Sequence, residues 1–292
     1  MTIKRKFSLG AIGLLALLAL ARCAIPPEWG ANALLHPYRR HAAESPRDVG
    51  LAEEDLAVTV APAVELRGWL VHAKTAPSRG LIVWMHGVAD SRGSGVGFAQ
   101  RYSAEGWDVA AFDAHAHGDS GGEFCTYGYY EKHDVPKLLD ALASRGVHVT
   151  HTVLMGMSMG ASVALQAAPD EPRVRGVIAM APFATLWLAS YERKPYVMSD
   201  YAFRASVRKA EEIAQFRIDE VAPAEAVKRL SVPLLLIHGE NDDETPPAHS
   251  QRIYAAAASA QKRILIVPGA THRNLLSTPA PWGEIEAFLS GR

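Results

Sequence analysis

The sequence predicts an α/β fold, with a doubly wound, mostly parallel sheet and a small helical cap insertion. Short apolar runs recur along the chain, helix-favouring segments separate them, and one long interval after residue 183 breaks this alternation. Continuous apolar runs are typical of strands buried on both faces, and their alternation with helices indicates βαβ units. An apolar fraction of 49% excludes a disordered chain, and a net charge of −1 gives no electrostatic case for nucleic-acid binding.

The first 25 residues differ from the rest in charge and hydropathy. They carry Lys4, Arg5, Lys6 and Arg22 and no acid, and the remaining chain keeps 26 basic against 31 acidic residues, a balance of −5. Residues 7–21 form an uncharged, apolar run. A basic head followed by such a run is typical of a secretory signal peptide or an N-terminal membrane anchor.

The length of this run favours a signal peptide without excluding the anchor. Fifteen helical residues span about 22 Å, which is short of the ~30 Å hydrocarbon core. Residues 19–21 supply the small side chains of a cleavage site, whereas the basic head can snorkel to a headgroup layer and hold an anchor. Cys23 resembles a lipoprotein acylation site, although Arg22 departs from that pattern. Each alternative places the following domain outside the cytoplasm, exported or membrane-associated.

The rest of the chain divides into a proline-containing stretch and one domain. Residues 26–55 show no clear period and are interpreted as a linker, or as a segment that packs on the fold. Residues 56–292 are expected to form the α/β domain. Its strands are expected at 56–61, 64–73, 80–87, 107–113, 151–158, 174–183, 232–239 and 263–269, and its helices at about 95–105, 131–144, 159–168, 248–260 and 281–290.

The cap insertion is expected at about 184–231. A loop of that length inside a compact domain is usually functional or carries its own structure. Insertions in open parallel sheets sit over the carboxyl ends of the strands, where ligands bind. Its aromatic residues either line a substrate pocket or pack the insertion onto the domain; they are Trp187, Tyr191, Tyr196, Tyr201 and Phe203.

A candidate catalytic serine lies in the G-x-S-x-G motif at 156–160. The motif follows a strand-like run and precedes a helix-like one, which predicts a sharp turn that exposes the hydroxyl of Ser158. A serine that only caps the helix is the alternative. The segments 86–88, 238–247 and 269–272 also follow strands, so their polar residues are expected at the same edge of the sheet.

These motifs resemble those of the α/β-hydrolase superfamily, and most closely the BEM46-like bacterial serine hydrolases of serine-aminopeptidase type. The resemblance covers roughly residues 56–290. The family pattern H-G-x-x-D-x-x-x-P matches residues 238–246, and D-x-R-G-H-G-x-S-x-G matches residues 113–122. His115 and Ala116 replace the arginine and first glycine of the second pattern, so the local salt bridge of that arginine is not carried over.

The resemblance implies a role for each candidate residue. Ser158 is the nucleophile, His272 takes its proton, and Asp242 orients His272, in the chain order Ser, Asp, His of this fold. The backbone N–H groups of Val88 and Met159 form the oxyanion hole. The mechanism needs no cofactor and no metal, and the sequence has no Cys/His spacing typical of a zinc site.

Other residues compete for two of these roles. Glu240, Asp243 and Glu244 share the turn of Asp242, and acidic turn residues often only cap or face water. His238 and His249 are alternatives to His272, although they fall in a strand-end motif and a helix.

The expected function is hydrolysis of an ester, thioester or amide through an acyl-enzyme. Carboxylesterase-like action is preferred because an apolar cap suits acyl groups. The alternatives are a serine peptidase of aminopeptidase type and a non-catalytic binding protein on the same fold. The expected partner is a small-molecule acyl substrate or a short peptide, with membrane association through the N-terminus and no nucleic acid.

Overall fold

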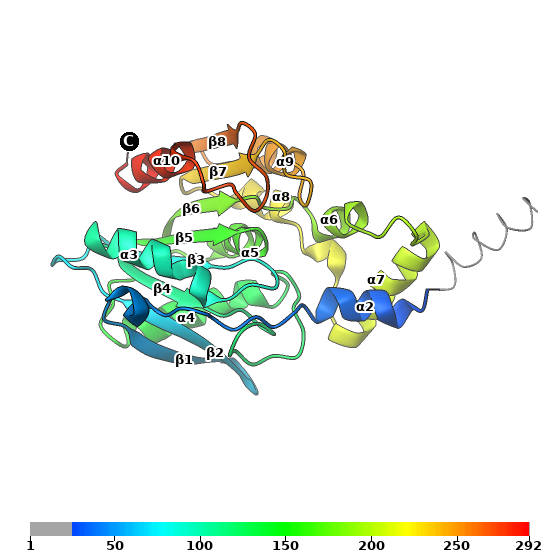
Figure 1. Ribbon diagram of the computed structural model, residues 1–292, viewed down its shortest axis with the longest axis horizontal. Coiled ribbons are helices and arrows are strands. Elements are labelled where there is room, and N and C mark those ends of the chain that lie inside the picture. The colour runs from blue at the N-terminus through cyan, green and yellow to red at the C-terminus, as the bar shows by residue number, and fades with distance from the viewer. Residues whose placement is uncertain (1–24, 292) are drawn as a thin grey trace, which may run out of the picture.

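The computed structural model describes residues 25–291, and its centre is an 8-stranded sheet in the order β1-β2-β4-β3-β5-β6-β7-β8 (Figure 1). The first two strands run antiparallel to their neighbours, and the other six are parallel to one another. The doubly wound, mostly parallel fold predicted from the apolar runs is therefore confirmed. The strands are β1 (Glu54–Ala61), β2 (Val64–Val71), β3 (Leu81–Met85), β4 (Asp108–Phe112), β5 (Thr152–Met157), β6 (Val174–Met180), β7 (Leu234–Gly239) and β8 (Lys262–Val267).

Helices cover both faces of the sheet. Alternate residues of β3 face opposite sides, so Leu81 and Val83 enter one apolar cluster while Ile82 and Trp84 enter another. The first cluster includes side chains of α4 (Asp134–Ala143), α5 (Met159–Ala167) and α9 (Ala248–Ala256), and the second includes side chains of α3 (Val96–Ala104) and α10 (Pro279–Leu289). Burial on both faces explains why these strands read as continuous apolar runs.

The interval between β6 and β7 forms a helical cap beyond the carboxyl ends of the strands (Figure 1). Its helices are α6 (Leu186–Glu192), α7 (Asp200–Ala214) and the short α8 (Pro223–Ala226). Ser199 caps α7, because its hydroxyl accepts a hydrogen bond from the Ala202 N–H. The apolar face of α7 belongs to a third core cluster, separate from the two that sandwich the sheet.

The stretch expected as a linker contains a helix that packs on the cap. Helix α2 (Pro27–Leu35) lies beside α7 (Figure 1), and its Ala31 and Leu35 belong to the cap cluster. The two helices approach closely at Gly30, where an added Cβ would lie 2.3 Å from Ser206 Oγ. For residues 27–35 the structure has the second of the two interpretations of 26–55, a segment that packs on the fold rather than a linker, and this segment forms a wall of the cap.

Among residues 25–291, no helix is both long and apolar enough to cross a membrane. The expected signal peptide, membrane anchor or acylated Cys23 falls in residues 1–24, outside the described part of the chain.

Candidate active site

Ser158 stands on a strained turn between β5 and α5. Its φ of 53° and ψ of −113° lie in a region that non-glycine residues rarely adopt. The surrounding backbone imposes this conformation, since the Ser158 N–H donates to Met180 O at 2.7 Å. Both motif glycines are required by close approach: a Cβ on Gly156 would lie 2.5 Å from Gly160 C, and one on Gly160 would lie 2.1 Å from Met85 O. The turn holds the serine at the carboxyl edge of the sheet.

Asp242 and His272 meet after β7 and β8. His272 Nδ1 lies 2.7 Å from Asp242 Oδ2, and the Thr245 N–H donates to Asp242 Oδ1 at 2.8 Å. Because a carboxylate accepts, the imidazole proton sits on Nδ1, which leaves Nε2 as the basic nitrogen. Burial opposes ionisation of Asp242, but hydrogen bonds from His238, His272 and Thr245 outweigh it and hold the pKa of this carboxyl well below its usual range.

His238 supports Asp242 from behind. Its Nε2 lies 2.6 Å from Thr245 O and 3.3 Å from Asp242 Oδ2, and its Nδ1 lies 2.6 Å from Ser250 Oγ. The imidazole is fully buried, and both neighbours of Nε2 are acceptors, so this nitrogen carries a proton. His238 therefore helps to position the carboxylate of Asp242. From the sequence it was considered only as an alternative to His272.

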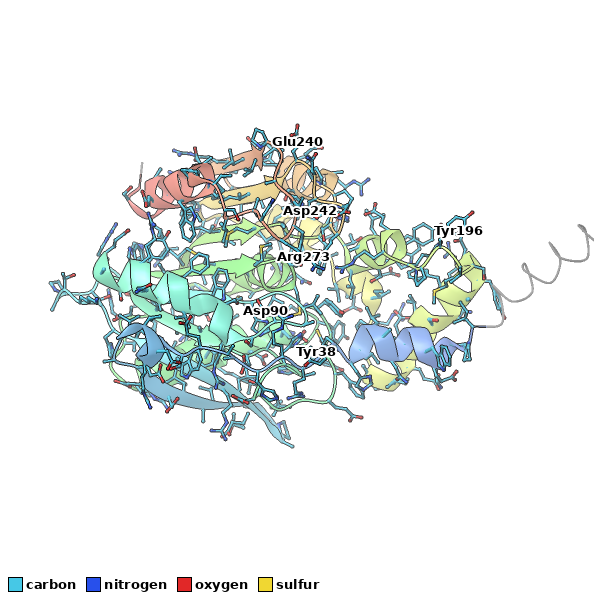
Figure 2. All side chains as sticks on the ribbon, in the orientation of Figure 1. Tyr38, Asp90, Tyr196, Glu240, Asp242 and Arg273 are labelled. Atoms are coloured by element: carbon cyan, nitrogen blue, oxygen red, sulfur yellow. The ribbon has the colours of Figure 1, made fainter. Side chains whose placement is uncertain are left out.

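The other acidic residues of this turn have different contacts. Glu240 accepts a hydrogen bond from the Gly269 N–H at 2.9 Å, and Glu244 accepts one from Arg273 at 2.8 Å. Asp243 is exposed. Figure 2 shows Asp242 and Arg273 at the sheet edge that faces the cap.

The second alternative base, His249, is also engaged elsewhere. The Ala184 N–H donates to its Nδ1 at 2.9 Å, and its Nε2 lies 2.8 Å from Glu192. The structure thus brings Ser158, Asp242 and His272 to one edge of the sheet, with the last two hydrogen-bonded. No hydrogen bond within the described residues joins Ser158 to His272, a contact that often tightens only in a substrate complex.

Two backbone N–H groups lie beside Ser158. The loop after β3 touches the serine turn, since a Cβ on Gly87 would lie 3.5 Å from Ser158 Cβ. Val88 and Met159 line one cavity together with Ser158, and neither N–H donates to another described residue. Met159 is the first residue of α5, where the helix dipole is positive. Such paired donors can stabilise a developing oxyanion.

Sequence reasoning missed how two histidines hold this loop. The Ala114 N–H donates to His86 Nε2 at 3.0 Å, and the Ala89 N–H donates to His117 Nε2 at 3.1 Å. Both Nε2 atoms are therefore unprotonated, so His86 Nδ1 donates to Gly87 O at 2.7 Å and His117 Nδ1 donates to its own loop. Gly87 O and the Val88 N–H belong to the same peptide unit, so His86 fixes the orientation of that donor.

Burial keeps both histidines neutral. Desolvation lowers the pKa of His117 to about 4, with a further contribution from the neighbouring His86, and desolvation also lowers the pKa of His86. A protonated His117 Nε2 could not accept the Ala89 N–H. The family pattern at 113–122 includes His117, but it does not specify these contacts, because they are made to backbone atoms.

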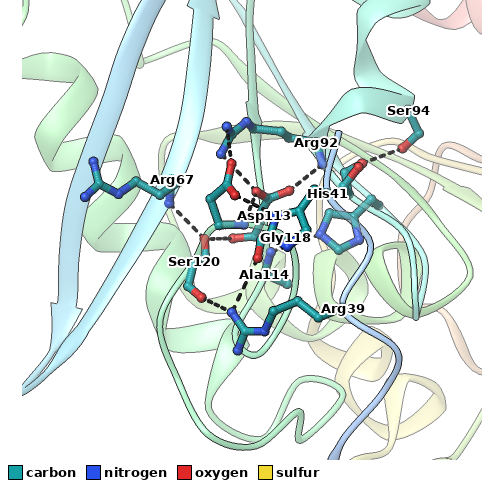
Figure 3. A network of polar contacts seen from close by, with 12 residues as sticks. Arg39, His41, Arg67, Arg92, Ser94, Asp113, Ala114, Gly118 and Ser120 are labelled. Atoms are coloured by element: carbon teal, nitrogen blue, oxygen red, sulfur yellow. Dashed lines mark hydrogen bonds and ion pairs between the residues drawn. The ribbon is translucent and has the colours of Figure 1, made fainter. Parts of the chain in front are cut away.

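Residues 113–122 form the loop that carries His117. Asp113 is its centre, accepting hydrogen bonds from the Arg92 N–H at 2.6 Å, the Arg92 guanidinium at 2.9 Å and the Asp119 N–H at 2.9 Å (Figure 3). His115, where the family pattern has arginine, instead lies 2.8 Å from Asp134. The loop is therefore held mainly by Asp113.

The chain after α2 is attached to this same loop. Arg39 donates to Ser120 O and to Gly122 O, the latter at 3.1 Å, and Figure 3 shows its guanidinium beside the loop. The C-terminal end of α2 has a further contact, since Tyr127 Oη donates to Leu34 O at 3.1 Å. These contacts fix α2 over the site.

A cavity of about 790 Å³ extends from Ser158 between the sheet edge and the cap. Its walls come from α2, α6, α7 and the loop after β3, and they are mainly apolar. Phe203 is the one cap aromatic of the five considered that lines it, whereas Trp187 and Tyr191 stack on each other with ring centroids 5.1 Å apart. The remaining two, Tyr196 and Tyr201, are exposed.

Comparison with known proteins identifies the family. The model of the family described as serine aminopeptidase, S33, matches residues 76–211 and 188–278. The chain belongs to this family. The strand-end motifs and the cap helices between β6 and β7 fall inside the matched ranges, whereas α2 lies before them. The match shows the α/β-hydrolase fold and confirms the BEM46-like resemblance, and the chain spans about three fifths of the length of the first curated relatives that it matches.

Relatives and solved structures agree with the family. The chain is 28% identical to the uncharacterized protein YqkD of Bacillus subtilis, covering 65% of this chain and 63% of YqkD. It is 22% identical to the protein bem46 of Schizosaccharomyces pombe, covering 86% of this chain and 81% of bem46. The Pyrococcus furiosus esterase Pf2001 superposes with a TM-score of 0.67 at 21% identity, covering 88% of this chain and 97% of Pf2001, which shows a common fold.

Proposed function

We propose that the protein is a carboxylic ester hydrolase that works through Ser158, His272 and Asp242. His272 Nε2 takes the hydroxyl proton as Ser158 Oγ attacks the carbonyl carbon, and the tetrahedral oxyanion accepts hydrogen bonds from the Val88 and Met159 N–H groups. The protonated imidazole then gives its proton to the leaving alcohol. Water, deprotonated by the same nitrogen, attacks the acyl-enzyme and releases the carboxylic acid.

One observation carries this proposal: a serine on a strained turn opens into an apolar cavity with two unpaired N–H groups beside it. The Asp242–His272 hydrogen bond at 2.7 Å supports the assignment of the base. A serine that served only as a helix cap would need no strained backbone, and its side chain makes no capping hydrogen bond to α5.

The cavity favours an ester over an aminopeptidase substrate. An aminopeptidase pairs the α-ammonium group of its substrate with a carboxylate or another acceptor set. The described residues that line this cavity include no aspartate or glutamate, and its charged side chains are Arg193 and Lys194. The solved neighbour Pf2001 is named as an esterase, which supports the same choice.

The test is hydrolysis of p-nitrophenyl esters of short and long acids by the wild type and by Ser158→Ala. We expect activity in the wild type and a loss of at least about 10⁴-fold in the variant. Equal activity in both proteins would overturn the assignment of Ser158. Aminoacyl p-nitroanilides serve as the comparison substrate, and faster cleavage of these amides than of the esters would favour the peptidase. If Ser158 of the folded wild type does not react with a fluorophosphonate probe, the protein is a binding protein rather than a hydrolase.

A further inference from the structure

Exposed apolar side chains gather at the outer end of the cap. Trp29 is 72% exposed, Tyr196 87%, Val197 61% and Tyr201 68%. Three of them lie close in sequence around the start of α7, and the fourth lies on α2. The segment before α7 and helix α2 approach each other next to these residues, since a Cβ on Gly30 would lie 3.5 Å from Met198 Cε. We call these four residues the outer cap surface, and Figure 2 shows Tyr196 at that end of the molecule.

The cavity connects the outer cap surface with the candidate nucleophile. Trp29 and Val197 line it and are exposed, whereas Ser158 lines it and is 7% exposed. An acyl chain that enters beside Trp29 therefore reaches Ser158 along walls that are mainly apolar. Large apolar side chains exposed at the end of such a cavity indicate an interaction site rather than ordinary surface.

The chain enters the described part at the same place. Ile25 lines the cavity, and only three residues separate it from the apolar run that ends at Ala21. Even fully extended, the four peptide steps from Ala21 to Ile25 reach about 14 Å. Where that run is held in a bilayer, Ile25 lies within this distance of the end of the run, and Ile25 lines the same cavity as Trp29 and Val197.

We propose that the outer cap surface docks on a lipid bilayer and that the substrate is a long-chain acyl ester drawn from it. This substrate rests on the proposed ester hydrolase function, whereas the docking does not. Tryptophan and tyrosine have an apolar ring and one polar atom, and they concentrate where hydrocarbon meets water. With the rings in the interface, the acyl chain passes from bilayer to cavity without crossing water.

The docking is tested with the full-length protein bound to phosphatidylcholine vesicles whose acyl chains carry bromine, which quenches nearby tryptophans. Residues 1–24 contain no tryptophan, so quenching reports on the folded domain. Trp69, Trp84 and Trp107 are buried. We expect strong quenching in the wild type and at least a twofold smaller quenched signal in Trp29→Phe. Equal quenching in the two proteins would overturn the docking.

The delivery of substrate is tested with Tyr196→Ser/Tyr201→Ser, in which neither changed residue lines the cavity. We expect hydrolysis of a long-chain p-nitrophenyl ester dissolved in the vesicles to fall about tenfold, a loss of roughly 1.4 kcal/mol in transition-state stabilisation. Hydrolysis of water-soluble p-nitrophenyl acetate stays within twofold, which also shows that the variant folds. Tyr38→Ser is the matched control, since Tyr38 is 74% exposed beyond the other end of α2.

The outcomes separate the two proposals. Unchanged vesicle activity in Tyr196→Ser/Tyr201→Ser would overturn delivery from the bilayer. Absence of any ester hydrolysis by the wild type would overturn the ester hydrolase while leaving the quenching of Trp29 as independent evidence for docking. Concentration-dependent dimers that these two substitutions abolish, with Trp29 unquenched, would assign the surface to a second copy of the chain.

Discussion

The sheet edge and the cap build the site in different ways. At the edge, Ser158, Asp242 and the loop at 86–88 are held by buried hydrogen bonds, many of them to backbone atoms. In the cap, α2 and α7 come from distant parts of the chain and enclose the cavity with apolar side chains. Hydrogen bonds fix the orientation of the groups that they join, whereas apolar packing fixes only the volume and shape of the cavity. In the proposed hydrolase, the edge therefore carries the reaction, and the cap selects the substrates that reach it.

The sharpest test of the sheet edge is Asp242→Asn. An amide keeps the size of the carboxylate but no longer stabilises the imidazolium or enforces the Nδ1–H tautomer of His272, so we expect kcat for ester hydrolysis to fall by about 10³–10⁴-fold. The measurement is steady-state kinetics with p-nitrophenyl acetate. Asp243→Asn is the matched control on the neighbouring exposed residue, and an equal loss in both variants would remove Asp242 from the mechanism.

A smaller effect is expected from His117→Phe, which removes the acceptor of the Ala89 N–H. The Val88 donor loses part of its orientation, so we expect kcat to fall about 10–100-fold while KM changes little. His117→Gln, whose amide oxygen can accept the same N–H, recovers part of the rate. A purely structural role would lower the amount of folded protein and leave kcat per active site, titrated with a fluorophosphonate, unchanged.

Protonation of His117 also predicts how stability depends on pH. Its folded pKa of about 4 lies below the ordinary value of 6.5, so the unfolded chain takes up a proton first as the pH falls. This histidine therefore removes about 2 kcal/mol of stability between pH 7 and pH 4.5 and costs nothing more above pH 7. Urea unfolding at both pH values measures it. Between these pH values the free energy of unfolding is expected to fall by about 2 kcal/mol less in His117→Phe than in the wild type. An identical fall in the two proteins would contradict the lowered pKa of His117.

The cap is tested by Ala189→Phe, a change inside the cavity wall on α6. Ala189 is buried and lines the cavity, so a phenyl ring there fills space that an acyl chain needs. We expect kcat/KM for p-nitrophenyl decanoate to fall about tenfold more than for the acetate, a difference of roughly 1.4 kcal/mol. Equal losses for both esters would mean that long chains do not occupy this cavity.

What the sequence could predict follows the same division between edge and cap. The position of Ser158 depends on a local strand, turn and helix, and each strand-end motif is readable from its own apolar run. The family pattern at 113–122 includes His117, but the contacts of His86 and His117 were missed because both are made to backbone groups, which the pattern does not specify. Helix α2 was missed because its buried side chains, such as Leu35, have a partner only once α7 is in place.

The attachment of α2 has a practical consequence for where this protein is truncated for expression. A boundary drawn at the first strand, Glu54, would keep every candidate catalytic residue and the entire sheet. It would also discard Arg39 and the whole of α2, so the apolar face of α7 would be left bare and the cavity would become an open trough. In the proposed ester hydrolase, such a fragment would keep the residues that act on small soluble esters, and a substrate screen made with it would give a broader specificity than that of the longer chain.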